Sequence, residues 1–158
     1  MFTHEEKKEL RQAFWNSFAE RTRSIKNKRG YSKKWMLYKT GIKGIELKFH
    51  LDHICAYVMI EINRSNNQER KVLFELLYSF KTPIENTFKN ELVWDREIFL
   101  TEKKKVARIY FETEPANIYV QEQWPDIIDF MVRHMTRLER AWRENADVIK
   151  EQSKAILN

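Results

Sequence analysis

The sequence predicts an α+β fold in the order α-ββ-α-ββ-α, with an antiparallel sheet of four to five strands and helices packed mainly on one face. Apolar and polar residues alternate along 45–62 and 92–113, and a short polar turn interrupts each stretch, as expected of two β-hairpins. Apolar residues recur every three to four positions in three other segments. The 158 residues include only three Gly and three Pro, which fits a single ordered domain spanning 1–158.

The first element is predicted to be a helix from Thr3 to about Arg21. Thr3 and Glu6 have the spacing of a capping box, and acidic residues occupy the first turn, where the helix dipole favours them. The apolar stripe is made of Leu10, Phe14, Trp15 and Phe18, which we assign to the core.

The central hairpin has one register that satisfies the alternation on both of its strands. If Asp52-His53 is a two-residue turn, Phe49 lies opposite Ala56 on the apolar face. The same register puts other residues together on the opposite, mixed face: Glu46 with Met59, Lys48 with Tyr57, and His50 with Cys55.

The later elements follow from turn and breaker residues. A helix is expected from about Asn67, with a kink or a short second helix at Pro83, where Thr82 would be a new N-cap and Glu85 its capping partner. The second hairpin is 92–100 and 105–113, and 117–120 would add a short extended piece.

The last helix is predicted to start near 123–126 and to run for about 27 residues, roughly 40 Å at 1.5 Å per residue. That is longer than a compact domain needs. We therefore expect its end, from about residue 144, to protrude, fray or pair with another subunit.

Positive charge is concentrated in one connection. Of 29 Lys and Arg residues, nine lie between Arg21 and Lys43, which holds no Asp or Glu, and the remainder carries 20 basic and 23 acidic residues, a net of −3. The connection 24–43 also contains aromatic residues, and cations interleaved with aromatics suit nucleic acid. The candidate contacts are Lys28, Arg29, Lys33, Lys34 and Lys39 for phosphates, with Tyr31 and Trp35 for stacking. In the alternative interpretation, the aromatics anchor a solvated loop to the core.

Several features together resemble an uncharacterised bacterial domain family of about this length. Its members occur alone or fused behind nuclease-like domains of restriction-endonuclease type, which implies an association with nucleic-acid metabolism or defence but no catalytic residue. The matching features are Phe14-Trp15 with Phe18, Trp35-x-x-Tyr38-Lys39-Thr40-Gly41, Ile60-Glu61-Ile62, Arg108-Ile109-Tyr110, Trp124-Pro125 with Phe130, and Trp142.

Catalytic and metal chemistry find little support. Glu46-Leu47-Lys48 has the Glu-x-Lys pattern of metal-dependent nucleases, but no carboxylate precedes it between Arg21 and Lys43. His50, His53 and Cys55 cluster at the hairpin tip without zinc-like spacing. We therefore expect no catalytic residue, metal or cofactor.

Three functions remain open from the residues alone. The first is a non-enzymatic module that binds DNA or RNA, or assists a nuclease, through the basic connection. The second is a protein-interaction module, which would form a homodimer or bind a partner through the last helix or a sheet edge. The third is a divergent metal-dependent nuclease. A single Cys, a charged N-terminus and the lack of a run of roughly 20 apolar residues predict a cytoplasmic protein without a membrane segment.

Overall fold

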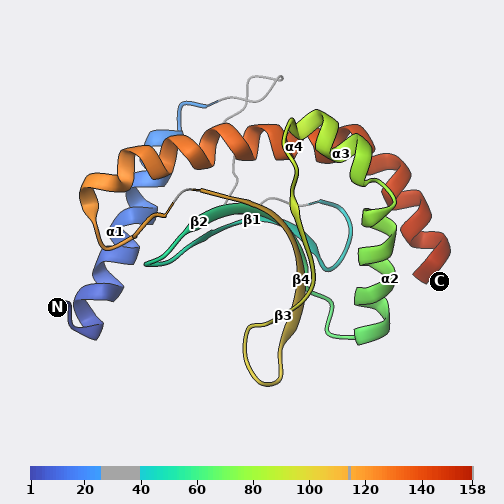
Figure 1. The fold of residues 1–158 in the computed structure, drawn as a ribbon, viewed down its shortest axis with the longest axis horizontal. Coiled ribbons are helices and arrows are strands. Elements are labelled where there is room, and N and C mark those ends of the chain that lie inside the picture. Colours follow the sequence, from blue (N-terminus) through green and yellow to red (C-terminus); the bar gives the residue numbers. More distant parts are fainter. Residues whose placement is uncertain (26–39, 114, 158) are drawn as a thin grey trace.

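Two β-hairpins meet side by side to form the sheet. The computed structural model describes residues 1–25, 40–113 and 115–157 (Figure 1). The elements follow in the order α1 (His4–Thr22), β1 (Ile45–Leu51), β2 (Ala56–Ile62), α2 (Asn67–Tyr78), α3 (Lys81–Phe88), β3 (Val93–Phe99), β4 (Lys105–Glu112), the 3-10 turn η2 (Gln121–Gln123) and α4 (Trp124–Leu157). The predicted α+β class is confirmed.

The sheet has four strands in the order β1-β2-β4-β3, and every neighbouring pair is antiparallel. The inner strands of the two hairpins, β2 and β4, therefore form the centre. Residues 117–120 add no strand. Instead, the backbone N–H groups of Ala116 and Ile118 donate to the carbonyls of Ile54 and Asp52, so this segment runs beside the β1–β2 turn.

The predicted register of the central hairpin is wrong by two residues, although each residue lies on the predicted face. Phe49 pairs with Val58, not Ala56, and Glu46 pairs with Glu61, not Met59. The cause is the turn, which is longer than two residues. Asp52 Oδ1 accepts hydrogen bonds from the backbone N–H groups of Ile54 (2.7 Å) and Cys55 (2.9 Å), and its own N–H donates to the Cys55 carbonyl (3.1 Å). An aspartate that hydrogen-bonds the backbone in this way stabilises a wider turn than the primed two-residue type.

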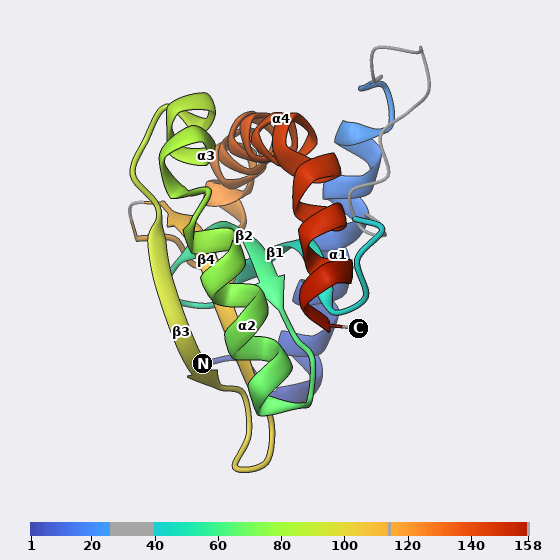
Figure 2. The ribbon, with the colours of Figure 1, turned by 90° about the vertical axis from the view of Figure 1, so that its right-hand side faces the viewer.

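All four helices lie on one side of the sheet. In Figure 1 they lie above the arched sheet and at its two ends, and Figure 2 shows α4 across the top with α1 and α2 on either side. The residues between sheet and helices form the core, whose largest fully buried side chains include Trp142, Phe14, Phe18, Phe74 and Phe88. We call the side of the sheet turned away from the helices the open face.

The N-cap predicted from local sequence is correct for the first helix and wrong for α3. Thr3 Oγ1 accepts from the Glu6 N–H and the Glu6 carboxylate accepts from the Thr3 N–H, so the predicted capping box is confirmed. The second helix near Pro83 is also confirmed as α3. Its N-cap, however, is Phe80 and not Thr82.

The reason for the early start of α3 lies in Glu85. Its carboxylate accepts hydrogen bonds from the Leu92 N–H (2.7 Å) and the Trp94 indole (3.0 Å), which hold the start of β3. The carboxylate is therefore not available to cap a helix that begins at Thr82.

Helix α4 is continuous over 34 residues. On its inner side Ala146, Ile149 and Ser153 are buried, so the part beyond residue 144 packs along the domain over about two further turns. Among the described helices, none combines the length and the apolar run needed to cross a bilayer.

Candidate functional site

The seven predicted nucleic-acid contacts lie outside the described residues, because the structure describes nothing between Ile25 and Thr40. These residues are Lys28, Arg29, Tyr31, Lys33, Lys34, Trp35 and Lys39. The two described flanks are both fixed to the domain. Thr22 is buried and donates to the Phe18 carbonyl (2.8 Å), and Thr40 is buried and donates to the Ile45 carbonyl (2.6 Å).

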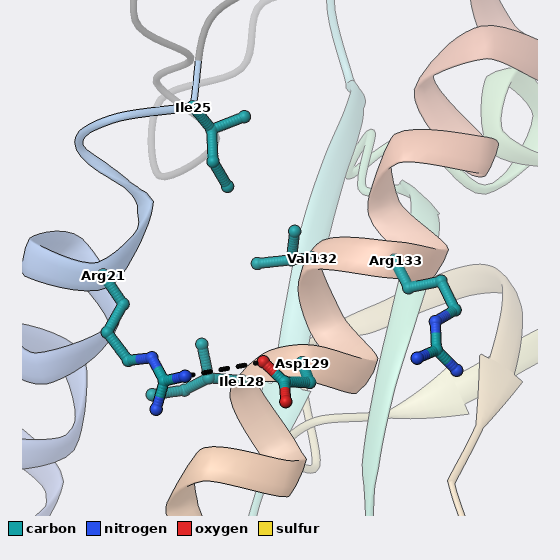
Figure 3. Close-up of a pocket in the computed structure, with 6 residues that line it drawn as sticks. All are labelled: Arg21, Ile25, Ile128, Asp129, Val132 and Arg133. Carbon is teal, nitrogen blue, oxygen red and sulfur yellow. Dashed lines mark ion pairs between the residues drawn. The ribbon is translucent and has the colours of Figure 1, made fainter.

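A pocket lies beside the first flank, between the end of α1 and α4. Its volume is about 320 Å³, and its lining residues are Arg21, Ile25, Ile128, Asp129, Val132 and Arg133. Figure 3 shows Arg21 reaching from α1 towards Asp129 on α4, at 3.6 Å, while Arg133 lies on the far side of Asp129. Both partners of that ion pair are about half exposed, so solvent screens it and it adds little stability.

Arg133 begins a row of arginines along α4. Arg137 and Arg140 follow at spacings of four and three residues, which places all three on one side of the helix. Arg133 and Arg140 are exposed. Of the acidic residues nearby, Glu139 lies 4.0 Å from Arg143, and Glu144 accepts a hydrogen bond from Thr87 on α3.

Two of these arginines, Arg133 and Arg137, also affect the pKa of the buried His134. Burial lowers the pKa of His134, and the positive charges of Arg137 and Arg133 lower it further, against a hydrogen bond to the Phe130 carbonyl that raises it. His134 is therefore held in its neutral form, packed among the rings of Phe88, Phe111 and Phe130.

An ion pair is buried on the open face, where the two central strands β2 and β4 pair. Glu61 on β2 lies opposite Arg108 on β4, and Arg108 donates to Glu61 Oε2 through Nε (3.0 Å) and Nη2 (2.9 Å). Glu61 Oε1 accepts from Lys48 (2.9 Å) and from Asn63 (3.1 Å). Burial alone would raise the pKa of Glu61, but these hydrogen bonds outweigh it and the pKa lies below its ordinary value. Glu61 is a charged group with all of its acceptor capacity in use.

The corrected register brings a second carboxylate next to Glu61. Glu46 lies directly opposite it, Lys48 is two residues along, and Asn63 bridges the two carboxylates at 2.8 and 3.1 Å. Glu61 therefore supplies a carboxylate on the strand next to Glu46-Leu47-Lys48, but it follows this motif in the chain, whereas the nuclease pattern needs an acidic residue that precedes it. In addition, four donors already surround Glu61, and among the described residues no third carboxylate, His or Cys joins the pair in a metal-ligand cluster. The arrangement is that of a structural ion-pair network.

The charges on the open face do not suit a phosphate backbone. Along β1, β2 and β4 it carries the carboxylates of Glu46, Glu61 and Glu112 against two cations, and both cations contact Glu61. Its rings are also occupied: Tyr57 is stacked between His50 and Tyr110, with centroids 4.4 Å away on each side. Rings that already stack on one another offer no free platform to a base.

One end of the open face collects groups that can bind a metal. His50 Nε2 lies 2.9 Å from Asp52 Oδ2, and the ligand atoms of His50, Asp52 and Cys55 all lie within 4.8 Å of one another. We expected His53 in this cluster. The wider turn places Asp52 there instead.

Comparison with known protein families assigns the chain to a domain family. The family described as Domain of unknown function (DUF4268) matches residues 10–146. The chain belongs to this family. No curated protein and no solved structure matches it significantly. Membership in DUF4268 agrees with the resemblance to an uncharacterised domain family and assigns no activity.

Sequence reasoning missed the Glu61–Arg108 pair, although a signal was present. Glu61 interrupts a run of apolar residues in β2, where all seven positions are buried. A carboxylate in a fully buried strand needs a cationic partner. Arg108 occupies the corresponding place in β4, but the pairing of β2 with β4 was needed to connect the two.

Proposed function

We propose that this DUF4268 domain is a non-enzymatic nucleic-acid-binding or nuclease-accessory module that acts in the cytoplasm and contacts phosphates through the basic segment 21–43. The observation that carries the proposal is the charge distribution: nine Lys or Arg and no Asp or Glu in 23 consecutive residues, in a chain that is otherwise net acidic. Such a segment releases counterions when it binds a polyanion, which is the main source of sequence-independent affinity.

The described residues support this location in two ways. The described start of the segment, residues 21–25, lies beside Arg133, at the start of the arginine row of α4, so this row offers further cations next to it. The open face, the other large polar surface, has its cations committed to Glu61 and its rings stacked on one another. Of the described surfaces, the α1–α4 side is therefore the better neighbour for phosphates.

The test is binding of fluorescently labelled single- and double-stranded DNA and RNA by anisotropy, as a function of salt. If the segment engages four phosphates of duplex DNA, raising salt from about 50 to about 150 mM weakens binding about 50-fold, because log K falls by about 0.9 per phosphate for each unit of log salt. The variant with Lys28, Arg29, Lys33 and Lys34 changed to Ser should lose most of this salt dependence.

The matched control removes the same charge elsewhere. Lys8, Lys71, Lys103 and Lys104 are exposed and lie on α1, α2 and the β3–β4 turn, so changing them to Ser lowers the net charge equally while leaving the segment intact. Specific use of the segment predicts that this control binds much more tightly than the segment variant. Equal binding by both variants, or no binding by the wild type near physiological salt, would refute the proposal.

The edge strand β3 favours the second candidate, a protein-interaction module. Val93 and Phe99 on β3 and Leu100 just after it are exposed by 47%, 60% and 41%, and within the described residues β3 pairs with β4 alone. An edge strand with exposed apolar side chains can pair with another chain. Light scattering after gel filtration tests this: a homodimer predicts a mass that rises with concentration, and Phe99→Ser should reduce it. A monomeric mass at all concentrations excludes the homodimer.

A further inference from the structure

The turn end of the open face brings three potential metal ligands together, with a further carboxylate near them. His50 is the next-to-last residue of β1, and Asp52 and Cys55 begin and end the turn. The Glu112 carboxylate, at the end of β4, lies near the Cys55 thiol. His50 and Glu112 are on the same face of the sheet, since both pair with Tyr57.

We propose that His50, Asp52 and Cys55 form a binding site for a divalent transition metal of the zinc class, with the nearby Glu112 available as a fourth ligand. Imidazole nitrogen, thiolate sulfur and carboxylate oxygen are the three donor types that Zn²⁺ uses in proteins. A cluster of oxygen ligands alone would suit Mg²⁺ or Ca²⁺, whereas a sulfur and an imidazole favour a softer ion. The absence of a zinc-like sequence spacing is explained by the fold, because the fourth ligand comes from a strand more than 50 positions away.

The ligand positions require only a small adjustment to hold an ion. In a tetrahedral zinc site with bonds of about 2.0 to 2.3 Å, neighbouring ligand atoms lie about 3.3 to 3.6 Å apart. His50 and Asp52 are now 2.9 Å apart, and Cys55 lies within 4.8 Å of both. Opening the first separation slightly and shortening the others by at most about 1.3 Å gives the tetrahedral spacing, which side-chain rotation alone can supply. All three side chains are half-buried, so water and ions can reach them.

Contacts around the site position the ligands, and the His50 Nε2–Asp52 Oδ2 contact opens when an ion binds between these two atoms. Asp52 binds the turn backbone through Oδ1 and leaves Oδ2 directed at His50. The His50 ring stacks on Tyr57, with centroids 4.4 Å apart and an angle of 14° between the planes. The turn is itself tied to the segment after β4 by three backbone hydrogen bonds of 2.8 to 3.0 Å, from Thr113, Ala116 and Ile118. A site assembled in advance in this way binds an ion at a lower ordering cost.

The local charge also favours a cation. The carboxylates of Asp52 and Glu112 lie near Cys55, and a bound divalent ion would compensate their negative charge. When Cys55 binds the ion, its thiol proton is released to solvent.

The experiment is titration of the full chain with Co²⁺, which reports its ligands spectroscopically. A tetrahedral site that includes Cys55 predicts visible d–d bands and a near-ultraviolet sulfur-to-cobalt charge-transfer band, both abolished by excess Zn²⁺. His50→Ala should weaken binding at least 100-fold, and Cys55→Ser should remove the charge-transfer band. His53→Ala is the matched control: this exposed histidine lies in the same turn, outside the cluster, and its loss should change the affinity less than about 2-fold.

A measurement on the unaltered protein covers the case in which a variant does not fold. Zn²⁺ should protect Cys55, the only cysteine, from alkylation by iodoacetamide, and a chelator should restore the reaction. The proposal is overturned if Co²⁺ at about 1 mM produces no charge-transfer band, which means a dissociation constant in the range of non-specific binding. It is also overturned if Zn²⁺ leaves the alkylation rate unchanged, or if His50→Ala and His53→Ala weaken binding equally.

Discussion

Removing the arginine of the buried ion pair should destabilise the domain strongly. Arg108→Met keeps an unbranched apolar stem but removes two charge-assisted hydrogen bonds to Glu61 and one to the Tyr57 hydroxyl, at 2.7 Å. Glu61 is 2% exposed and would retain only Lys48 as a cationic partner. Breaking a buried pair costs about 3 to 5 kcal/mol, and since Lys48 remains, we expect roughly 3 kcal/mol.

Thermal and urea unfolding measure this loss. For a chain of 158 residues the entropy of unfolding near the midpoint is roughly 0.33 kcal/mol per degree, so the melting temperature should fall by about 9 °C. The comparison is Arg21→Met, which breaks the exposed pair with Asp129 and should cost less than about 1 kcal/mol. If Arg108→Met lowers the free energy of unfolding no more than Arg21→Met does, the inference that the variant leaves a buried Glu61 charge without its main partner is refuted.

The dependence of folding stability on pH in the acid range tests the role of the Glu61 charge independently. Because the pKa of Glu61 is lowered in the folded state, its stabilising contribution is fully present above the unfolded pKa and is lost as the pH falls through the folded value. The difference in stability between wild type and Glu61→Gln should therefore shrink below about pH 4. A difference that stays constant down to acid unfolding would contradict the charge-based explanation.

Three further predictions concern local features. Thr3→Ala removes the capping box of α1 and should cost about 1 kcal/mol in urea unfolding, and no loss would mean that the helix start does not contribute. Gly44→Ala should cost about 1 to 2 kcal/mol, because φ is +85° and the new methyl would clash with the side chain of Arg64; unchanged stability would contradict the positive φ. His134 should titrate below its ordinary pKa in an NMR pH series, and its contribution to stability, complete above about pH 6.5, should be lost as the pH falls through the folded value; an ordinary or raised pKa would refute its burial as a neutral ring.

The parts of the fold that the sequence predicts are those controlled by local patterns. The alternation in β1 and β2 identifies the strands and their faces, because side chains alternate strictly along a strand. It does not determine the register, since a shift of two residues preserves every face. The side chain of Asp52 decided between the two registers, and its bonds to Ile54 and Cys55 are formed only in the folded turn.

The features that the sequence did not reveal depend on contacts between distant residues. Glu85 has the spacing of a capping residue for Thr82, yet its carboxylate binds Leu92 and Trp94, which are close only after β3 has paired. In the same way, Cys55 and Glu112 come together through the pairing of β2 with β4. The basic segment differs from these features. Its charge is evident in the sequence, and its residues 26–39 lie outside the described part of the chain.

The order of strands in the sheet has a consequence for how the domain can be divided. Each hairpin joins neighbouring strands, but the central pairing of β2 with β4 joins residues such as Glu61 and Arg108 that are 47 positions apart. An isolated two-stranded hairpin is at best marginally stable, so neither half should fold without the other, and unfolding should occur in one cooperative step. A cut between β2 and β3 would therefore give two unfolded fragments. The exposed turn 101–104 lies away from the central pairing, and it is the place in the described chain where an inserted sequence should be tolerated best.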